Sequence, residues 1–256
     1  MCPLRPPYFN RKGVPILFVQ SSAQQQNGRP WCATIIDMKK GASISEEHGI
    51  EAMPKDALYV YSVGVSTAGA AEVRMAQANA ERRIVATTID KQGVVDTQKA
   101  IERLGLDDRI AVKFEDIAQQ LPYADNTFDY AYARLVFHYL TKQQLPKALA
   151  ELYRVLKPGG TVFIVVRSTK NIDANERATS YDEHSGLTTY TTRPNSELEE
   201  VRKRFFHTSE SIEQYVKSSG FTITQSKQYD ERLFHDYGRT IVAQHTDNLL
   251  EVLATK

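Results

Sequence analysis

Three polar positions, each just after an apolar strand-like run, are the residues of this sequence best suited to chemistry. YVYSV is followed by Gly64, Ser66 and Gly69 in GVSTAG, RIVATTI by Asp90, and IAVKFE by Asp116. A turn of small residues lets a ligand approach the backbone closely. A carboxylate accepts hydrogen bonds from hydroxyl and amino groups. Together these positions favour a site for a nucleoside.

The first turn has three interpretations. It reads G-x-S-x-x-G, where a dinucleotide-binding turn has G-x-G-x-x-G, and Ser66 would crowd a diphosphate, so a ligand without one is favoured. The same residues are one position short of the G-x-S-x-G elbow, with Ser66 as a hydrolase nucleophile. This ranks lower, because only a hairpin precedes the turn and no His-Gly-Gly element occurs before Gly64. The third interpretation is a tight turn that holds nothing.

The two aspartates also carry alternatives. Asp90 is placed to accept both hydroxyl hydrogens of a ribose, but an aspartate before KQGVVDTQKAIERLG is equally suited to capping that helix. Asp116 is placed to accept a hydrogen bond from an exocyclic amine such as that of adenine, with Ile117 packing on the ring. Glu115 is a less suitable substitute for Asp116.

The elements that position these residues alternate between strand and helix from residue 57 onward. The strand-like runs are apolar throughout and not at every second residue, which indicates a parallel sheet buried on both faces. We therefore predict an α/β, doubly wound, Rossmann-like fold, mostly parallel, with helices on both faces and ligand beyond the carboxyl ends of the strands.

Residues outside this core divide the chain into further parts. VPILFVQSS and PWCATIIDM, separated by a turn at Asn27-Gly28, predict a β-hairpin over residues 14–38. The expected divisions are 1–56 (hairpin and connector), 57–167 (cofactor-binding core), 168–208 (lid or insertion) and 209–256 (the rest of the sheet).

Composition limits the possible partners. The 256 residues are 41% hydrophobic, and 32 basic residues face 31 acidic ones, for a net charge of +1. A chain of this length fits one hydrophobic core. The near balance of basic and acidic residues gives no charged surface that would attract nucleic acid or an anionic membrane. No apolar run approaches the ~18 residues of a membrane span, and the amino terminus lacks a signal-peptide core, so a cytoplasmic protein is expected. Cys2 and Cys32 have no metal-ligand spacing, and no metal is predicted.

The region from Asp90 onward carries a resemblance. FEDIAQQLPYADNTFDYAYARLVFHYL, ALAELYRVLKPGG and TVFIVV resemble the small-molecule branch of the class I S-adenosylmethionine-dependent methyltransferases. The resemblance covers about residues 57–167. It implies a seven-stranded sheet whose last pair is antiparallel, and S-adenosylmethionine as cofactor.

The resemblance also implies cofactor contacts. Gly64 opens the turn around the methionine end, Asp90 binds ribose, and Asp116 with Ile117 binds adenine; Lys91, next to Asp90, is a further cofactor-binding residue. Ser62 and Ser66 stand where the family motif D/E-x-G-x-G-x-G has its acid and second glycine, and Ala68 stands at the third. Arg134 lies near the cofactor rim. These departures leave open a catalytically inactive relative that binds another nucleoside or a protein.

The implied reaction is in-line methyl transfer to a small-molecule acceptor, for which positioning supplies most of the rate. His138 is the candidate base, and its alternative is a histidine packed against Tyr139. Tyr181, His184 and Tyr190, with Arg193, are expected to bind the acceptor from the lid. A solvated surface insertion is the other reading of this segment.

The remaining expectations concern the carboxyl-terminal part. Residues 202–206 are predicted to begin a helix, RTIVAQH to form the last strand and residues 247–253 to form a short helix. A homodimer through the hairpin or the lid is possible.

Overall fold

The computed structural model describes residues 43–65, 69–192, 199–234, 242–243 and 245–256, together with two short strands near the amino terminus. These strands, β1 (Leu17–Val19) and β2 (Thr34–Ile36), pair antiparallel, as the hairpin prediction requires. The predicted turn at Asn27-Gly28 lies outside the described residues.

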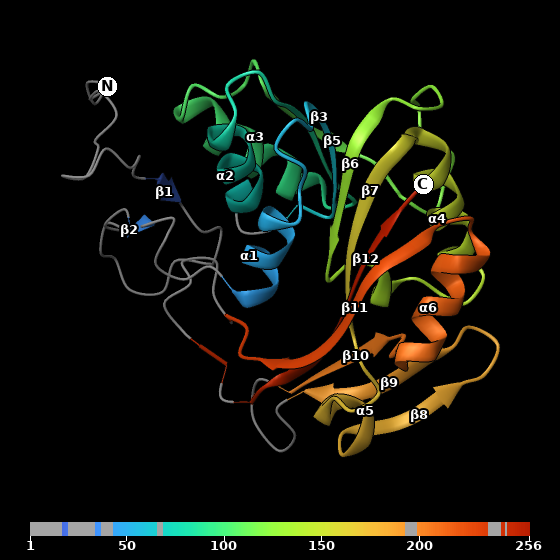
Figure 1. Ribbon diagram of the computed structural model, residues 1–256. Coiled ribbons are helices and arrows are strands. Elements are labelled where there is room, and N and C mark those ends of the chain that lie inside the picture. The colour runs from blue at the N-terminus through green and yellow to red at the C-terminus, as the bar shows by residue number, and fades with distance from the viewer. Residues whose placement is uncertain are drawn as a thin grey trace, which may run out of the picture.

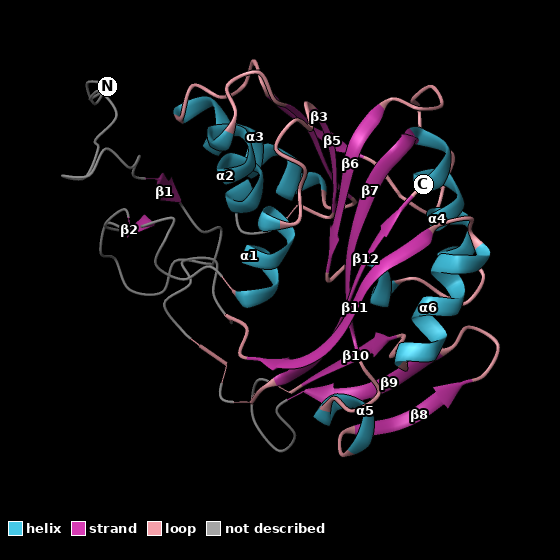
Figure 2. Cartoon of the chain, viewed as in Figure 1, coloured by secondary structure: helices cyan, strands magenta, loops and turns pink. Residues whose placement is uncertain are grey.

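A seven-stranded sheet forms the centre of the protein, in the order β11-β12-β7-β6-β3-β4-β5 (Figure 2). The pairs among β3, β4, β5, β6 and β7 are all parallel, whereas β12 runs antiparallel to both β7 and β11. This confirms the predicted mostly parallel sheet. Its strands are Tyr59–Val63 (β3), Arg83–Thr88 (β4), Ile110–Phe114 (β5), Phe128–Arg134 (β6), Leu156–Arg167 (β7), Thr222–Glu231 (β11) and Asp247–Thr255 (β12).

Helices cover both faces of this sheet (Figure 1). One face carries α1 (Ile44–Glu51), α2 (Ala70–Ala78) and α3 (Lys91–Arg103), and the other α4 (Gln144–Val155) and α6 (Ser209–Ser218). Strand β6 contributes side chains to the hydrophobic cores on both faces of the sheet. Its alternate residues Tyr130 and Tyr132 join the core under α1–α3, while Ala131 and Ala133 join the core under α4 and α6.

The last strand differs from the expectation. The strand expected over residues 239–245 falls largely outside the described residues, and the helix expected over 247–253 is wrong, because β12 (Asp247–Thr255) is a strand. A run that is buried on both faces, such as NLLEVLA, has no alternating pattern to distinguish strand from helix. Pairing with both β7 and β11 decides it.

The segment between β7 and α6 is also more regular than expected. It contains a one-turn helix, α5 (Ile172–Asn175), and a three-stranded antiparallel sheet of β8 (Ala178–Asp182), β9 (Leu187–Thr192) and β10 (Glu200–Arg204). The helix expected to begin at residues 202–206 is therefore wrong. In Figure 1 this small sheet lies beyond the end of the main sheet opposite to the carboxyl terminus. We call it the cover sheet.

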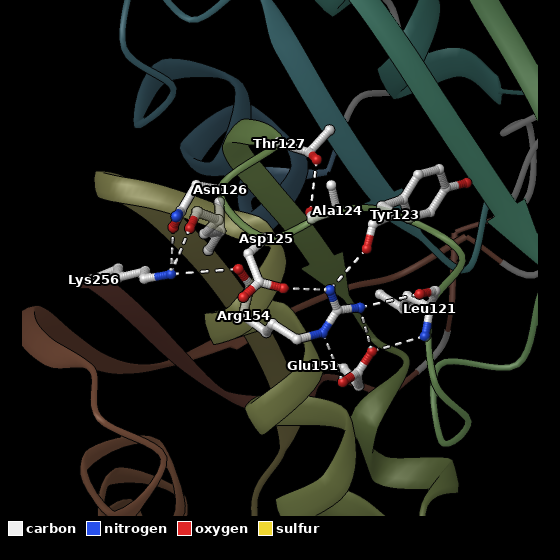
Figure 3. A network of polar contacts seen from close by, with 10 residues as sticks. Leu121, Tyr123, Ala124, Asp125, Asn126, Thr127, Glu151, Arg154 and Lys256 are labelled. Carbon is white, nitrogen blue, oxygen red and sulfur yellow. Dashed lines mark hydrogen bonds and ion pairs between the residues drawn. The ribbon is translucent and has the colours of Figure 1, made fainter.

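Arg154 of α4 fixes the loop that joins β5 to β6 (Figure 3). Its guanidinium donates to the carbonyl oxygens of Leu121 and Tyr123, at 3.0 and 2.7 Å, and to the Asp125 carboxylate at 2.8 Å. Glu151, one turn earlier, pairs with the same guanidinium and accepts from the Leu121 amide at 2.7 Å. These charged contacts raise the pKa of Arg154. One side chain therefore joins three residues of the loop to α4.

Replacing Arg154 by Met should lower the melting temperature by roughly 5 °C, because the loop loses several charge-assisted hydrogen bonds and Glu151 loses its partner. Differential scanning calorimetry measures this. Lys147→Met, at an exposed position of the same helix, is the matched control and should change the melting temperature by less than about 1 °C. Equal shifts for the two variants would contradict the assigned role.

Candidate functional site

The predicted site residues share one edge of the sheet. Strands β3, β4, β5, β6 and β7 are parallel, so their carboxyl ends, where Gly64, Asp90, Asp116 and Arg134 lie, face the same way. Ligands of open α/β sheets bind beyond this edge. The order β6-β3-β4-β5 puts the glycine turn in the middle, with both aspartates on one side of it. Ser66 lies outside the described residues.

Gly64 cannot be exchanged for another residue without a clash. Its φ is +75°, in the left-handed region that favours glycine, and a Cβ there would lie 2.3 Å from Val136 Cγ2. Val136 reaches this position because Leu135, at the end of β6, itself has a φ of 57°. A bulky residue in this conformation is rare and strained. The turns after β3 and β6 therefore pack directly on each other.

Ser62 brings a carboxylate to the end of β3 by contact with the following helix. Its hydroxyl donates to Glu72 Oε1 at 2.5 Å, and both residues are buried, Glu72 with 2% exposure. Glu72 is the third residue of α2 after its N-cap, Gly69, where an acidic side chain folds back toward the helix start. The sequence analysis missed Glu72 because the expected acid belongs on the strand; its position three residues after Gly69 was the available signal.

Asp90 is exposed at the end of β4 and caps α3. Its Oδ1 accepts from the Gln92 amide at 3.0 Å, while Oδ2 accepts no hydrogen bond within the described part of the chain. The capping alternative is thus observed, and one carboxylate oxygen remains for another donor. Lys91 is exposed beside it, with Nζ 5.7 Å from the centre of the Phe114 ring.

Asp116 begins a turn after β5. Its Oδ1 accepts from the Ala118 amide at 2.9 Å, and Ile117 packs into the core with 5% exposure. The preceding Glu115 is occupied elsewhere, because it accepts from the hydroxyls of Tyr61 at 3.0 Å and Tyr123 at 2.5 Å. Burial and the Glu115 carboxylate raise the pKa of both tyrosines. Glu115 is therefore structural, which supports the choice of Asp116.

Arg134 points toward α1. Its Nε donates to Ser45 Oγ at 2.7 Å, and a terminal nitrogen donates to Ser43 Oγ. The Ser45 amide in turn donates to Glu231 of β11, at 3.3 Å. Arg134 thus holds the start of α1 against the ends of β6 and β11.

The cover sheet is joined to the carboxyl edge by backbone hydrogen bonds. The Phe205 amide donates to the His138 carbonyl at 2.8 Å, and the His207 amide donates to the Arg167 carbonyl at 3.1 Å. His138 lies in a 3₁₀ turn, η2 (Phe137–Tyr139), after β6, and Arg167 ends β7. The segment after β10 therefore closes over the ends of β6 and β7.

Polar side chains lie under this cover, and we call them the cover cluster: His138, Tyr190, Arg204 and His207, which are buried, and Arg167, which is partly buried. His138 is 1% exposed, and burial, followed by the charges of Arg204 and Arg167, lowers its pKa well below the usual value. Burial lowers the pKa of His207 to about 3. Both imidazoles are therefore neutral at neutral pH. Within the described ranges, no hydrogen-bond partner meets His138 Nδ1, His207 Nε2, Arg167 Nε, Arg204 Nε or the Tyr190 hydroxyl.

The structure separates the three residues expected to bind an acceptor. Tyr190 is fully buried in the cover cluster, whereas Tyr181 is 58% exposed on β8. His184 is exposed in the β8–β9 turn, where its carbonyl accepts from Gln143 at 2.7 Å. Tyr181 and His184 thus do not share a site with Tyr190. His138 packs against Tyr139 with the ring centres 4.5 Å apart and the planes tilted by 50°, which is the packing alternative, and it also belongs to the cover cluster. Arg193 lies outside the described residues.

A groove adjoins the cover cluster. It has a volume of about 590 Å³ and is lined by Phe205 and Phe206 after β10, by Pro146 and Ala150 of α4 and by Tyr215 of α6, among others. Phe206 also contacts the ring of Tyr190, with centres 5.8 Å apart. Phe205 packs on the ring of His207, with centres 4.1 Å apart, so the groove meets the cover cluster through both phenylalanines.

No three His, Cys, Asp or Glu side chains in the described ranges are grouped to hold a metal ion. None of the helices in that part of the chain has the length and apolar character that crossing a bilayer requires.

The chain matches a known family over part of its length. Residues 62–164, which contain the carboxyl ends of β3, β4, β5 and β6, match the family described as "Methyltransferase domain". Among curated proteins, a sterol 4-C-methyltransferase of Caenorhabditis elegans is 41% identical over 70 residues, 27% of this chain and 20% of that protein. An uncharacterized methyltransferase of Synechocystis is 25% identical over 142 residues, 53% of this chain and 62% of that protein. The match spans less than two thirds of either relative.

Solved structures agree on the fold. A crystal structure of a SAM-dependent methyltransferase from Methanosarcina mazei superimposes with a TM-score of 0.63 and 16% identity, covering 80% of this chain and 95% of that one. The superposition extends the likeness well beyond residues 62–164.

Proposed function

Because this chain contains a class I S-adenosylmethionine-dependent methyltransferase domain, we propose that it transfers the methyl group of that cofactor to a small-molecule acceptor. One observation carries the proposal. The glycine turn, Asp90 and Asp116 stand at successive strand ends on one edge of the sheet, and the cover sheet closes over the neighbouring ends of β6 and β7. The strand ends proposed to bind the cofactor, those of β3, β4 and β5, thus lie next to the strand ends proposed to face the acceptor, those of β6 and β7.

The residues at this edge suit the cofactor. Gly64 presents bare backbone for the methionine end of the cofactor, and the Val136 side chain packs on the side of Gly64 where a Cβ would lie. Glu72 offers, through Ser62, the negative charge that the strand lacks, so the cofactor's ammonium has a partner. Asp90 Oδ2 is available for ribose hydroxyls, and Asp116 with Ile117 for adenine. Lys91 and Arg134 border this region.

The acceptor side needs few catalytic groups. When bound, the cofactor supplies an electrophilic methyl group, and an acceptor held in line reacts with it at a rate set mainly by positioning. The cover sheet excludes water from the ends of β6 and β7. His138 Nδ1 has no partner in the described chain, so the neutral imidazole can accept a hydrogen bond from an oxygen or nitrogen acceptor and orient it, while its lowered pKa makes it a weak base.

Relatives support a small acceptor. The Caenorhabditis elegans protein is named for methylation at carbon 4 of a sterol, which is a small molecule. The altered turn, with Ser62 and Ser66 in place of the family's acid and glycine, supports the alternative of a nucleoside-binding protein without catalysis. Binding of cofactor followed by a search for methyl transfer separates the two.

Asp90→Ser tests the cofactor site with little effect on the fold. Serine caps helices as well as aspartate does, so α3 should keep its start and the melting temperature should stay within about 1 °C. Serine is too short to bind both ribose hydroxyls. We expect isothermal titration to show S-adenosylmethionine bound by wild type and about tenfold or more weaker by Asp90→Ser.

Asp96→Ser, at a partly exposed position further along α3, serves as the control for the titration and should bind as wild type does. If wild type binds no S-adenosylmethionine or S-adenosylhomocysteine at millimolar concentration, the proposed function is wrong. If Asp90→Ser binds as tightly as wild type, Asp90 only caps α3.

A further inference from the structure

Arg204 is a buried cation without a carboxylate partner. It is 5% exposed at the end of β10, and one terminal nitrogen donates to the Tyr139 hydroxyl at 2.9 Å. No carboxylate in the described ranges lies within 4.0 Å of it, and its Nε has no partner there. Arginine remains charged when buried. A buried charge that lacks a counterion is strongly unfavourable.

The nearby acids are already occupied by other arginines. Asp173 contacts Arg167 at 3.4 Å and Arg177 at 3.0 Å, and Asp247 contacts Arg167. The two neighbouring histidines are neutral and add no charge. Among the described residues, three guanidinium groups thus share two carboxylates in this region, and Arg204 carries the excess positive charge.

Aromatic rings offset only part of this excess. The guanidinium carbon lies 4.9 Å from the centre of the Tyr139 ring and 5.6 Å from that of Tyr190. Such cation–π contacts are weaker than a hydrogen-bonded ion pair. They also hold the guanidinium in place, with its Nε unused. The arrangement resembles a preorganised anion site more than a completed structural contact.

The position of Arg204 connects it to the acceptor side. The next residue, Phe205, donates to the His138 carbonyl at 2.8 Å at the end of β6. The Tyr190 hydroxyl and His138 Nδ1 are also without partners in the described part of the chain. A donor fork, a hydroxyl donor and a neutral imidazole are thus buried together beside the proposed reaction edge.

We propose that Arg204 is the counterion of an acidic group on the methyl acceptor, so that the acceptor is a small organic anion. Tyr190 donates a second hydrogen bond to the same group. The planar fork of a guanidinium matches a carboxylate or a phosphate oxygen pair. This inference rests on the proposed function for the identity of the bound molecule as the acceptor.

Thermal unfolding of wild type, Arg204→Met and Arg202→Met tests the site without knowledge of the true acceptor. Arg202 is an exposed arginine on the same strand, paired with Glu200, and serves as the control. The probes are benzoate, phenyl phosphate and neutral benzamide. Without probe, Arg204→Met should melt a few degrees higher than wild type, because an unpaired buried charge is removed.

With probe, benzoate or phenyl phosphate should raise the melting temperature of wild type and Arg202→Met, by about 3 °C at ten times its Kd. Neither anion should stabilise Arg204→Met, and benzamide should stabilise none of the proteins. The anion with the larger shift identifies the acidic group. The inference is overturned if Arg204→Met melts below wild type, or if the anions shift both proteins equally or neither.

Calorimetric titration with S-adenosylhomocysteine separates this inference from the proposed function. Arg204→Met should bind it as wild type does. If wild type binds S-adenosylhomocysteine but shows no Arg204-dependent anion effect, the anionic acceptor is wrong and the methyltransferase proposal stands. If the anion effect is present and S-adenosylhomocysteine does not bind, the methyltransferase proposal is wrong and the anion site is not an acceptor site.

Discussion

Glu72→Gln is expected to weaken S-adenosylmethionine binding by about ten- to a hundredfold, the value of a charge-assisted hydrogen bond. Glu72 lies 2.5 Å from Ser62 Oγ at the end of β3, beside the turn that is proposed to bind the methionine end of the cofactor. Glutamine keeps the shape and can still accept from Ser62, but it carries no negative charge for the ammonium group. Isothermal titration with S-adenosylmethionine and S-adenosylhomocysteine measures the loss.

A charge swap makes this prediction sharper. Ser62→Asp combined with Glu72→Gln moves the carboxylate from the helix to the strand, and it should recover most of the lost affinity. Ser62→Asp alone puts two buried carboxylates side by side and should lower stability. Glu81→Gln, at an exposed position after α2, is the control for loss of one negative charge. Wild-type affinity in Glu72→Gln would show that the helix acid serves only the fold.

Gly64→Ala is expected to lower stability by about 2 to 5 kcal/mol and the melting temperature by roughly 10 °C. Two costs add at this position. A φ of +75° is strained for alanine, and the new Cβ would lie 2.3 Å from Val136 Cγ2. Because Val136 belongs to the turn after β6, the clash would also displace the start of η2 and reduce cofactor binding. Denaturant and thermal unfolding measure the loss.

Gly105→Ala is the matched control for Gly64→Ala. Gly105 has a φ of +63°, but nothing lies within 4 Å of a Cβ there, so alanine meets backbone strain alone, about 1–2 kcal/mol. The double variant Gly64→Ala/Val136→Ala removes the clash and should fall near the control. If Gly64→Ala is no less stable than Gly105→Ala, the contact between the turns after β3 and β6 does not contribute to the free energy of unfolding.

The fold was largely predictable because its central strands are apolar throughout and separated by amphipathic helices. That pattern requires burial on both faces, and burial on both faces requires a parallel sheet with helices on each side. It also placed Gly64, Asp90 and Asp116 at strand ends, and the parallel pairing of β3, β4 and β5 confirms that these ends share one edge. Whether these residues bind cofactor remains a prediction.

The secondary-structure predictions were wrong for two segments whose conformation depends on a strand that is distant in sequence. Residues 247–253 read as a helix because β12 is buried on both faces and lacks alternation. Residues 200–204 are charged except at Val201 and exposed except at Arg204, yet they form β10 by pairing with β9. In both cases, hydrogen bonds to another strand outweighed the local preference.

The spacing of apolar residues and turns was enough to predict the layers of this protein, the direction of its central strands and the edge that carries Gly64, Asp90 and Asp116. The tertiary structure alone decided which charges meet. Glu72 reaches the strand end only because α2 folds back over β3, and Arg204 joins His138 only because the cover sheet closes over β6. The energy of a buried charge depends on neighbours that are distant in sequence, and no local pattern records them.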